Sequence, residues 1–226
     1  MQPNPFSMKV FFKVGKYLFA LIWIVILHSS CCPTYDYPNE FKYLDVKYIP
    51  QKQQYWCWAA SSEMVLKYIH PQNGSFYKQC LQARICLEDT LDNCKCCLYP
   101  IHDTCNFPHW PIFDQLGFRV FNTDDNQVYL TWQNMLQEID NNRPLCLTYN
   151  WTGGGAHMII MNGYQIEDRQ LWDYVMDPYP GFLQLNNSDE NYPYAPVRIV
   201  RHQYNRSDPR HTLGRCYFNI GIATTN

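Results

Sequence analysis

The chain has 226 residues, which is enough for one domain of ordinary size with a buried core and too few for two comfortable ones. Its 18 basic and 20 acidic residues leave a formal net charge of −2. No run of Lys or Arg offers the positive surface that nucleic-acid binding needs. We therefore expect one domain with one active or binding site, and no nucleic-acid partner.

The first 32 residues have the order of an export signal. Lysines precede an apolar stretch from Tyr17 to Leu27, and Ser29 and Ser30 follow it. This order is typical of a secretory signal peptide. The apolar stretch is about half of the ~20 residues that a membrane-spanning helix requires, so export is predicted, with a retained anchor as the competing interpretation.

The signal ends in Cys31 and Cys32, which indicates a bacterial lipoprotein whose new N-terminal cysteine is acylated. Lipoprotein signals usually carry Leu three residues before the cysteine, whereas here His28 holds that position and Leu27 lies one residue earlier. Membrane attachment through a lipidated Cys31 or Cys32 and simple cleavage with release both stay open. We expect the protein in the bacterial cell envelope or secreted.

Residues 33–48 are rich in Tyr, Pro and Asp, and we expect them to form an extended lead-in to a domain that covers 49–226. From Trp56 to Tyr68, apolar residues recur at three- and four-residue spacing, which predicts an amphipathic helix. Cys57 then lies at or near the start of that helix.

Nine cysteines lie beyond the signal, and six of them fall within residues 80–105. In an oxidising compartment this cluster predicts an insertion cross-linked by disulfides. Zinc is the rival explanation, but the paired CxxC steps of zinc sites are absent, so we expect no metal and no other cofactor. Setting Cys57 aside leaves eight cysteines that could pair fully, although Cys146, in an apolar run, could be the unpaired one instead.

The second half of the chain indicates one helix followed by strands. Thr131 can cap a helix over residues 132–139, which the sequence NNRP at 141–144 ends. Short apolar or β-branched stretches predict strands at Leu145 to Tyr149, His157 to Tyr164, Leu171 to Met176, Val197 to Val200 and Arg215 to Ile222. The predicted fold class is α+β, with a helical half that carries Cys57 and an antiparallel sheet that carries His157.

A cysteine at a helix N-terminus suits nucleophilic chemistry. The unpaired N–H groups and the positive end of the helix dipole favour a thiolate over a thiol. A histidine on a facing strand would stabilise that thiolate further. A Cys between two Trp is, by itself, more often a core or disulfide residue, so the context of Cys57 has to decide.

The stretch IPQKQQYWCWAASSEMVLKY resembles the nucleophile segment of papain-like cysteine peptidases, in which a glutamine lies six residues before the cysteine and an aromatic residue follows it. Gln51 and Trp58 hold those positions. The resemblance implies that the Gln51 side chain and the Cys57 N–H form an oxyanion hole, with Gln53 or Gln54 as substitutes, and that Trp58 lines the substrate site.

The stretch NWTGGGAHMIIMNGY resembles the histidine segment of the bacterial branch of this superfamily and implies that His157 is the base. Its glycines would let the backbone pass close to substrate, so Gly154 and Gly155 are predicted substrate contacts. Val175-Met176-Asp177-Pro178 resembles the strand end where this branch places an orienting Asp. Asp177 is therefore predicted to hold the imidazole, with Asp173 as the alternative, although Asp before Pro is also a common turn.

Together the segments imply a papain-like fold and an exported cysteine endopeptidase that hydrolyses peptide bonds of a protein or peptide substrate through a thioester. The chain lacks the Cys-Gly-Ser-Cys-Trp run of plant-type papains, and it has Asp instead of Asn, which favours the compact secreted bacterial relatives. A transglutaminase or cell-wall amidase with the same triad, and a non-catalytic disulfide-rich binding module, are the alternatives. A monomer is expected.

Overall fold

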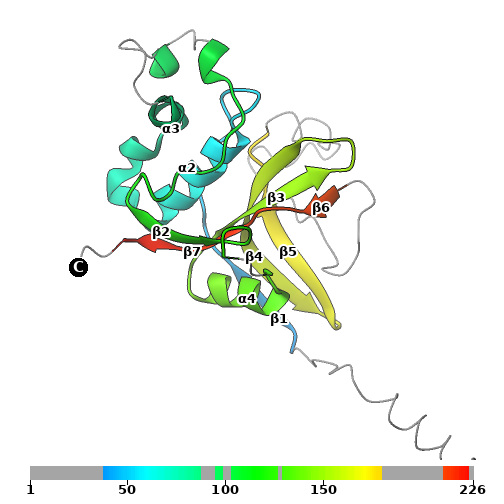
Figure 1. The fold of residues 1–226 in the computed structure, drawn as a ribbon. Coiled ribbons are helices and arrows are strands. Elements are labelled where there is room, and N and C mark those ends of the chain that lie inside the picture. Colours follow the sequence, from blue (N-terminus) through cyan, green and yellow to red (C-terminus); the bar gives the residue numbers. More distant parts are fainter. Residues whose placement is uncertain (1–37, 88–94, 99–102, 127–128, 180–210, 224–226) are drawn as a thin grey trace, which may run out of the picture. The chain divides into compact units, whose positions relative to one another are not determined.

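The computed structural model describes residues 38–87, 95–98, 103–126, 129–179 and 211–223 (Figure 1). All of them belong to one structural unit that begins at Pro38. The predicted signal with Cys31 and Cys32, Cys94, and the strand predicted at 197–200 lie outside the described residues.

The described chain is a mixture of helices and strands in this order: β1 (Glu40–Tyr43), α2 (Cys57–Ile69), the 3-10 helix η1 (Pro71–Tyr77), α3 (Gln79–Cys86), the short 3-10 helices η2 (Lys95–Cys97) and η3 (Asp103–Cys105), β2 (Phe118–Asn122), α4 (Trp132–Asp140), β3 (Leu145–Trp151), β4 (Ala156–Glu167), β5 (Gln170–Met176), β6 (His211–Leu213) and β7 (Tyr217–Ile222). The predicted α+β class is confirmed.

The strands form one antiparallel sheet in the order β1-β4-β3-β7-β2, with β5 beside β4 and β6 beside β3. Strand β4 is its centre, because it pairs with β3, β5 and β1. Residues 158–164 of β4 are buried at every position, so both faces of the strand are covered. Figure 1 shows α2 (cyan) and α4 (green) on opposite sides of these central strands.

Helix α2 is buried along nine consecutive residues, from Trp58 to Leu66. An amphipathic surface helix would expose one face, so this burial makes α2 a core helix. Its hydroxyls find partners there: Ser61 donates to the carbonyl of Met158 over 3.2 Å, and Ser62 hydrogen-bonds to the side chain of Gln82 on α3.

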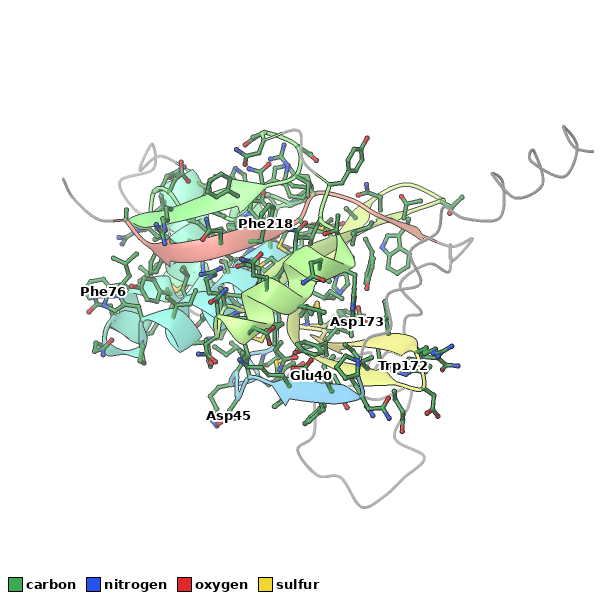
Figure 2. All side chains as sticks on the ribbon, turned by 90° about the horizontal axis from the view of Figure 1, so that it is seen from below. Glu40, Asp45, Phe76, Trp172, Asp173 and Phe218 are labelled. Atoms are coloured by element: carbon green, nitrogen blue, oxygen red, sulfur yellow. A yellow bond between two sulfur atoms is a disulfide. The ribbon has the colours of Figure 1, made fainter. Side chains whose placement is uncertain are left out.

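The structure extends most of the predicted elements by one to a few residues, shortens the strand predicted at Arg215 to Ile222 to Tyr217–Ile222, and adds other elements. The cap of α4 is as predicted: Thr131 Oγ1 accepts from the Asn134 N–H, and Asn134 Oδ1 accepts from the Thr131 N–H. Strands β1, β2 and β6 and helix α3 were not predicted. Strand β2 packs its Phe121 against Phe218 of β7, with ring centroids 6.2 Å apart. Phe218 is labelled in Figure 2.

The insertion is cross-linked by the disulfides Cys80–Cys97 and Cys96–Cys105. Cys86, Cys146 and Cys216 are free thiols, as is Cys57. Full pairing of the eight remaining cysteines is therefore wrong. Cys146 in β3 and Cys216 directly before β7 are buried, and a buried cysteine packs as a small apolar residue.

No helix in the described ranges combines the length and the apolar composition that crossing a membrane requires.

Gly163 allows β1 to approach β4 closely. The two strands pair Tyr43 with Gly163, and a Cβ at Gly163 would lie 2.6 Å from the carbonyl oxygen of Lys42 and 3.1 Å from Cα of Tyr43. We expect Gly163→Ala to lower the free energy of unfolding by about 1–3 kcal/mol, because backbone atoms must move apart. Urea denaturation followed by tryptophan fluorescence measures this loss.

Gly153→Ala is the matched control, since a Cβ there meets no atom within 4 Å. This variant should stay within about 0.5 kcal/mol of the parent protein. Equal unfolding midpoints for the two variants would contradict the close approach at Gly163.

Candidate active site

Cys57 is the first residue of α2, and its thiol is free and half-buried. The residue before it, Trp56, makes no side-chain capping hydrogen bond, and the first turn contains no acidic residue. Within the described residues, no capping side chain therefore binds the N–H groups of that turn. The positive end of the helix dipole lies at the residue that carries the sulfur.

His157 and Asp177 form the second part of the site. His157 lies near the start of β4, and Asp177 follows the end of β5. Their side chains are hydrogen-bonded, with His157 Nε2 2.7 Å from Asp177 Oδ1. The same oxygen accepts the backbone N–H of Tyr179 over 2.8 Å. Because Asp177 accepts at Nε2, the nitrogen left for a second partner is Nδ1.

That second partner is Cys57. Burial lowers the pKa of His157, but hydrogen bonds to Asp177 and to Cys57, together with their charges, outweigh it and raise the pKa to about 10. Cys57 and His157 are thus in contact although 100 positions separate them in the sequence. The side chains of His157 and Asp177 remain 19% and 20% exposed, so the charged pair is accessible from solvent.

Two hydrogen bonds to backbone carbonyls fix the relative positions of these segments. One turn after Cys57, the Ser61 hydroxyl bonds to the carbonyl of Met158, the residue that follows His157. The N–H of Gln51 bonds over 2.8 Å to the carbonyl of Pro178, the residue that follows Asp177. The chain around Cys57 is therefore tied to the residue that follows His157 and to the residue that follows Asp177.

Gln51 is 8% exposed and lies in the loop before Cys57. Its side-chain nitrogen donates to the carbonyls of Gln53, over 3.0 Å, and Gln54, over 2.8 Å. Gln53 is half-buried and Gln54 is exposed. The structure thus gives Gln51 a defined role in folding this loop, and both of its amide hydrogens are engaged there.

Trp58, predicted to line the substrate site, is only 1% exposed. Its ring packs against Phe107 at 6.1 Å and His109 at 5.3 Å between centroids, so it supports those two rings instead of facing solvent.

The predicted glycines, in contrast, lie in the exposed turn between β3 and β4, where Gly154 and Gly155 have φ of 93° and 85°. Only glycine adopts such angles readily, and the turn delivers His157 into β4.

Asp173 is not the partner of His157. It lies on β5 opposite Tyr164 and is 7% exposed (labelled in Figure 2). The carboxylate that contacts the imidazole is that of Asp177.

Two tyrosines near the triad were not predicted. Tyr149 lies directly opposite His157 in the β3–β4 pair, and burial, followed by the charges of Asp173, Cys216 and Asp177, raises its pKa. Within the described ranges the Tyr48 hydroxyl is buried without a hydrogen-bond partner, and burial and Asp177 raise its pKa to about 12. Both tyrosines therefore stay neutral at neutral pH and add no negative charge to the site. No sequence signal separates them from the many other tyrosines of the chain.

The arrangement of thiol, imidazole and carboxylate can support an ion pair of thiolate and imidazolium held by a carboxylate, which is the chemistry of nucleophilic acyl transfer. No group of three or more His, Cys, Asp or Glu side chains in the described part of the chain is placed to hold a metal ion.

Comparison with protein families matches residues 43–207, well over half of the chain, to the Peptidase_C39 like family. The chain belongs to this family. A search of the curated proteins found no match. The Peptidase_C39 like match contains Cys57, His157 and Asp177, and it confirms the predicted papain-like superfamily.

In this member of the Peptidase_C39 like family, Asp177 keeps the His157 ring protonated. Asp177→Ala removes the acceptor and the charge, so the pKa of His157 should fall from about 10 toward or below its ordinary 6.5. Asp177→Asn keeps an acceptor without the charge and should give an intermediate value. Titration of His157 by NMR of ¹⁵N-histidine-labelled protein measures the change.

Asp173→Asn serves as the control and should leave the His157 titration in place, because Asp173 acts on Tyr149. If the His157 pKa changes in Asp173→Asn but not in the Asp177 variants, Asp173 and not Asp177 is the partner of the imidazole.

Proposed function

We propose that the protein is an exported cysteine endopeptidase that hydrolyses peptide bonds through a thioester on Cys57. Membership of the Peptidase_C39 like family supports a cysteine peptidase-type function. The observation that supports the thioester mechanism is that His157 is hydrogen-bonded both to Cys57 and to Asp177.

In the first step the Cys57 thiolate attacks the peptide carbonyl carbon. A carbon–sulfur bond forms and the carbonyl electron pair moves to oxygen. Collapse of this intermediate breaks the carbon–nitrogen bond, and the imidazolium of His157 gives its proton to the leaving amine. Asp177 holds the ring in the orientation that presents Nδ1 to the sulfur and to the amine.

In the second step the neutral imidazole takes a proton from water, which attacks the thioester. The carbon–sulfur bond breaks, the acid product leaves, and the thiolate and imidazolium are restored. The same nitrogen of His157 therefore acts first as acid and then as base.

The oxyanion of both intermediates needs donors, and we assign the Cys57 N–H and the Gln51 side chain to this role. The Cys57 N–H belongs to the unpaired first turn of α2. Gln51 is fixed beside the Asp177 segment through its bond to Pro178. Because its amide hydrogens are bound to the Gln53 and Gln54 carbonyls, substrate must replace one of these bonds. The turn with Gly154 and Gly155 offers backbone to the substrate.

The proposal of export rests on the order of charged, apolar and small residues in the first 32 positions. The disulfides of the insertion support it, since such bonds persist in oxidising compartments. Lipidation at Cys31 or Cys32 would place the peptidase at the membrane surface.

Cys57→Ala should remove peptide hydrolysis, with a loss of about 10⁶-fold in kcat as expected for a missing nucleophile. Cleavage of casein and of a mixed peptide library, followed by mass spectrometry, measures it. Cys86→Ala is the matched control, because Cys86 is also a half-buried free thiol, and burial raises its pKa to about 11.

Full activity of Cys57→Ala would refute the assignment. Ammonia release with amine incorporation, in place of cleavage, would assign the same residues to a transglutaminase.

Gln51→Ala should lower kcat by about 10²-fold with little change in KM, because an oxyanion donor acts mainly in the transition state. Gln53→Ala and Gln54→Ala remove side chains that are half-buried or exposed and should have much smaller effects. Steady-state kinetics on a cleaved peptide decide among the three. A larger loss at position 53 or 54 would move the donor role there.

A further inference from the structure

The residues on both sides of Cys57 are held by one segment of the cysteine-rich insertion. The indole N–H of Trp56 donates to the carbonyl of Cys105 over 2.6 Å. The indole N–H of Trp58 donates to the carbonyl of Phe107 over 3.2 Å. Because the two tryptophans are the immediate neighbours of Cys57, these bonds fix the start of α2 at the nucleophile itself.

A third bond follows the same pattern. The backbone N–H of Tyr55 donates to the side-chain oxygen of Asn106 over 3.0 Å. Every residue from 105 to 107 thus accepts a hydrogen bond from the chain around Cys57. We call residues Cys105–Phe107 the bracing segment.

The bracing segment is itself fixed by the disulfides. Cys105 is bonded to Cys96, and both are fully buried. The next residue, Cys97, is bonded to Cys80 on α3. The disulfide Cys96–Cys105 therefore cross-links the bracing segment itself. The disulfide Cys80–Cys97 instead cross-links the neighbouring residue Cys97 to α3.

We propose that the bracing segment, held by the Cys96–Cys105 disulfide, positions Cys57 against His157 for the reaction, which rests on the proposed function. His157 and Asp177 are placed by the sheet, so they do not depend on this segment. If the segment loosens, the start of α2 shifts while the imidazole stays in place. The contact between sulfur and imidazole then lengthens, and a displacement of about 1 Å can cost about 10²-fold in rate. Asn106 and the Cys96–Cys105 pair are positioning residues, not catalytic ones.

A role in stability alone makes a different prediction, and paired disulfide variants separate the two. Cys96→Ser/Cys105→Ser frees the bracing segment, and Cys80→Ser/Cys97→Ser removes the other disulfide as the matched control. The assays use the full protein without added dithiol, at a temperature where near-ultraviolet circular dichroism shows both variants folded. The readouts are kcat, KM and the rate at which iodoacetamide alkylates Cys57 at pH 7, followed on the Cys57 peptide by mass spectrometry.

We expect Cys96→Ser/Cys105→Ser to lower kcat and the alkylation rate of Cys57 by about tenfold or more, with KM nearly unchanged. The control should stay within about twofold of the parent protein, although both variants lose thermal stability. Parent-like values for Cys96→Ser/Cys105→Ser, or equal losses in both pairs, would overturn the proposal.

Asn106 provides a test that leaves both disulfides in place. Asn106→Ala removes the acceptor of the Tyr55 N–H and should lower the alkylation rate of Cys57, whereas Asn106→Asp keeps an acceptor oxygen and should restore it. Equal rates for Ala, Asp and the parent would count against the role of Asn106. The alkylation rate needs no substrate, so it tests the bracing segment even if no peptide is hydrolysed. The absence of peptide hydrolysis would separately contradict the proposed function.

Discussion

The site depends on the balance of charge around one imidazole. His157 lies mostly buried, and burial alone would favour its neutral form, yet the carboxylate of Asp177 on one side and Cys57 on the other reverse this preference. Each of the three groups comes from a different element: the start of α2, the start of β4 and the end of β5. The pKa of the ring is therefore raised only when all three elements are docked.

Polar contacts inside the core enforce that docking. Strand β4 is buried on both faces, so its position in the sheet is set by packing. The hydrogen bond from the Ser61 hydroxyl to the carbonyl of Met158 fixes the position of α2 against this strand. Helix α2 is also tied to α3, because Glu63 accepts the N–H of Gln79. Buried polar groups that are satisfied only by one another specify a single arrangement of the elements that carry them. Helix α3 is thus joined to the core through its first residue.

The four free cysteines of the described chain differ in their surroundings. Burial raises the pKa of Cys86 to about 11 and of Cys216 to about 12, and it raises that of Cys146 as well. These thiols stay neutral and unreactive. Cys57 differs from them in position, since it lies at the uncapped start of a helix and in contact with a charged imidazole.

The local sequence by itself determined much of this protein. Short-range patterns, namely the helical period after Trp56, the cap at Thr131 and the apolar or β-branched stretches between Leu145 and Met176, predicted α2, α4 and the three central strands, because such elements depend on neighbouring residues. The resemblance of three segments to papain-like peptidases selected Cys57, His157 and Asp177. Tertiary structure alone decided the contact of Asp177, and not Asp173, with the imidazole, the burial of Trp58, the pairing of the cysteines, and the bracing of Cys57 by residues 105–107. These features join residues that are distant in the chain, and only the packing of α2 and the insertion against the sheet sets the distances between them.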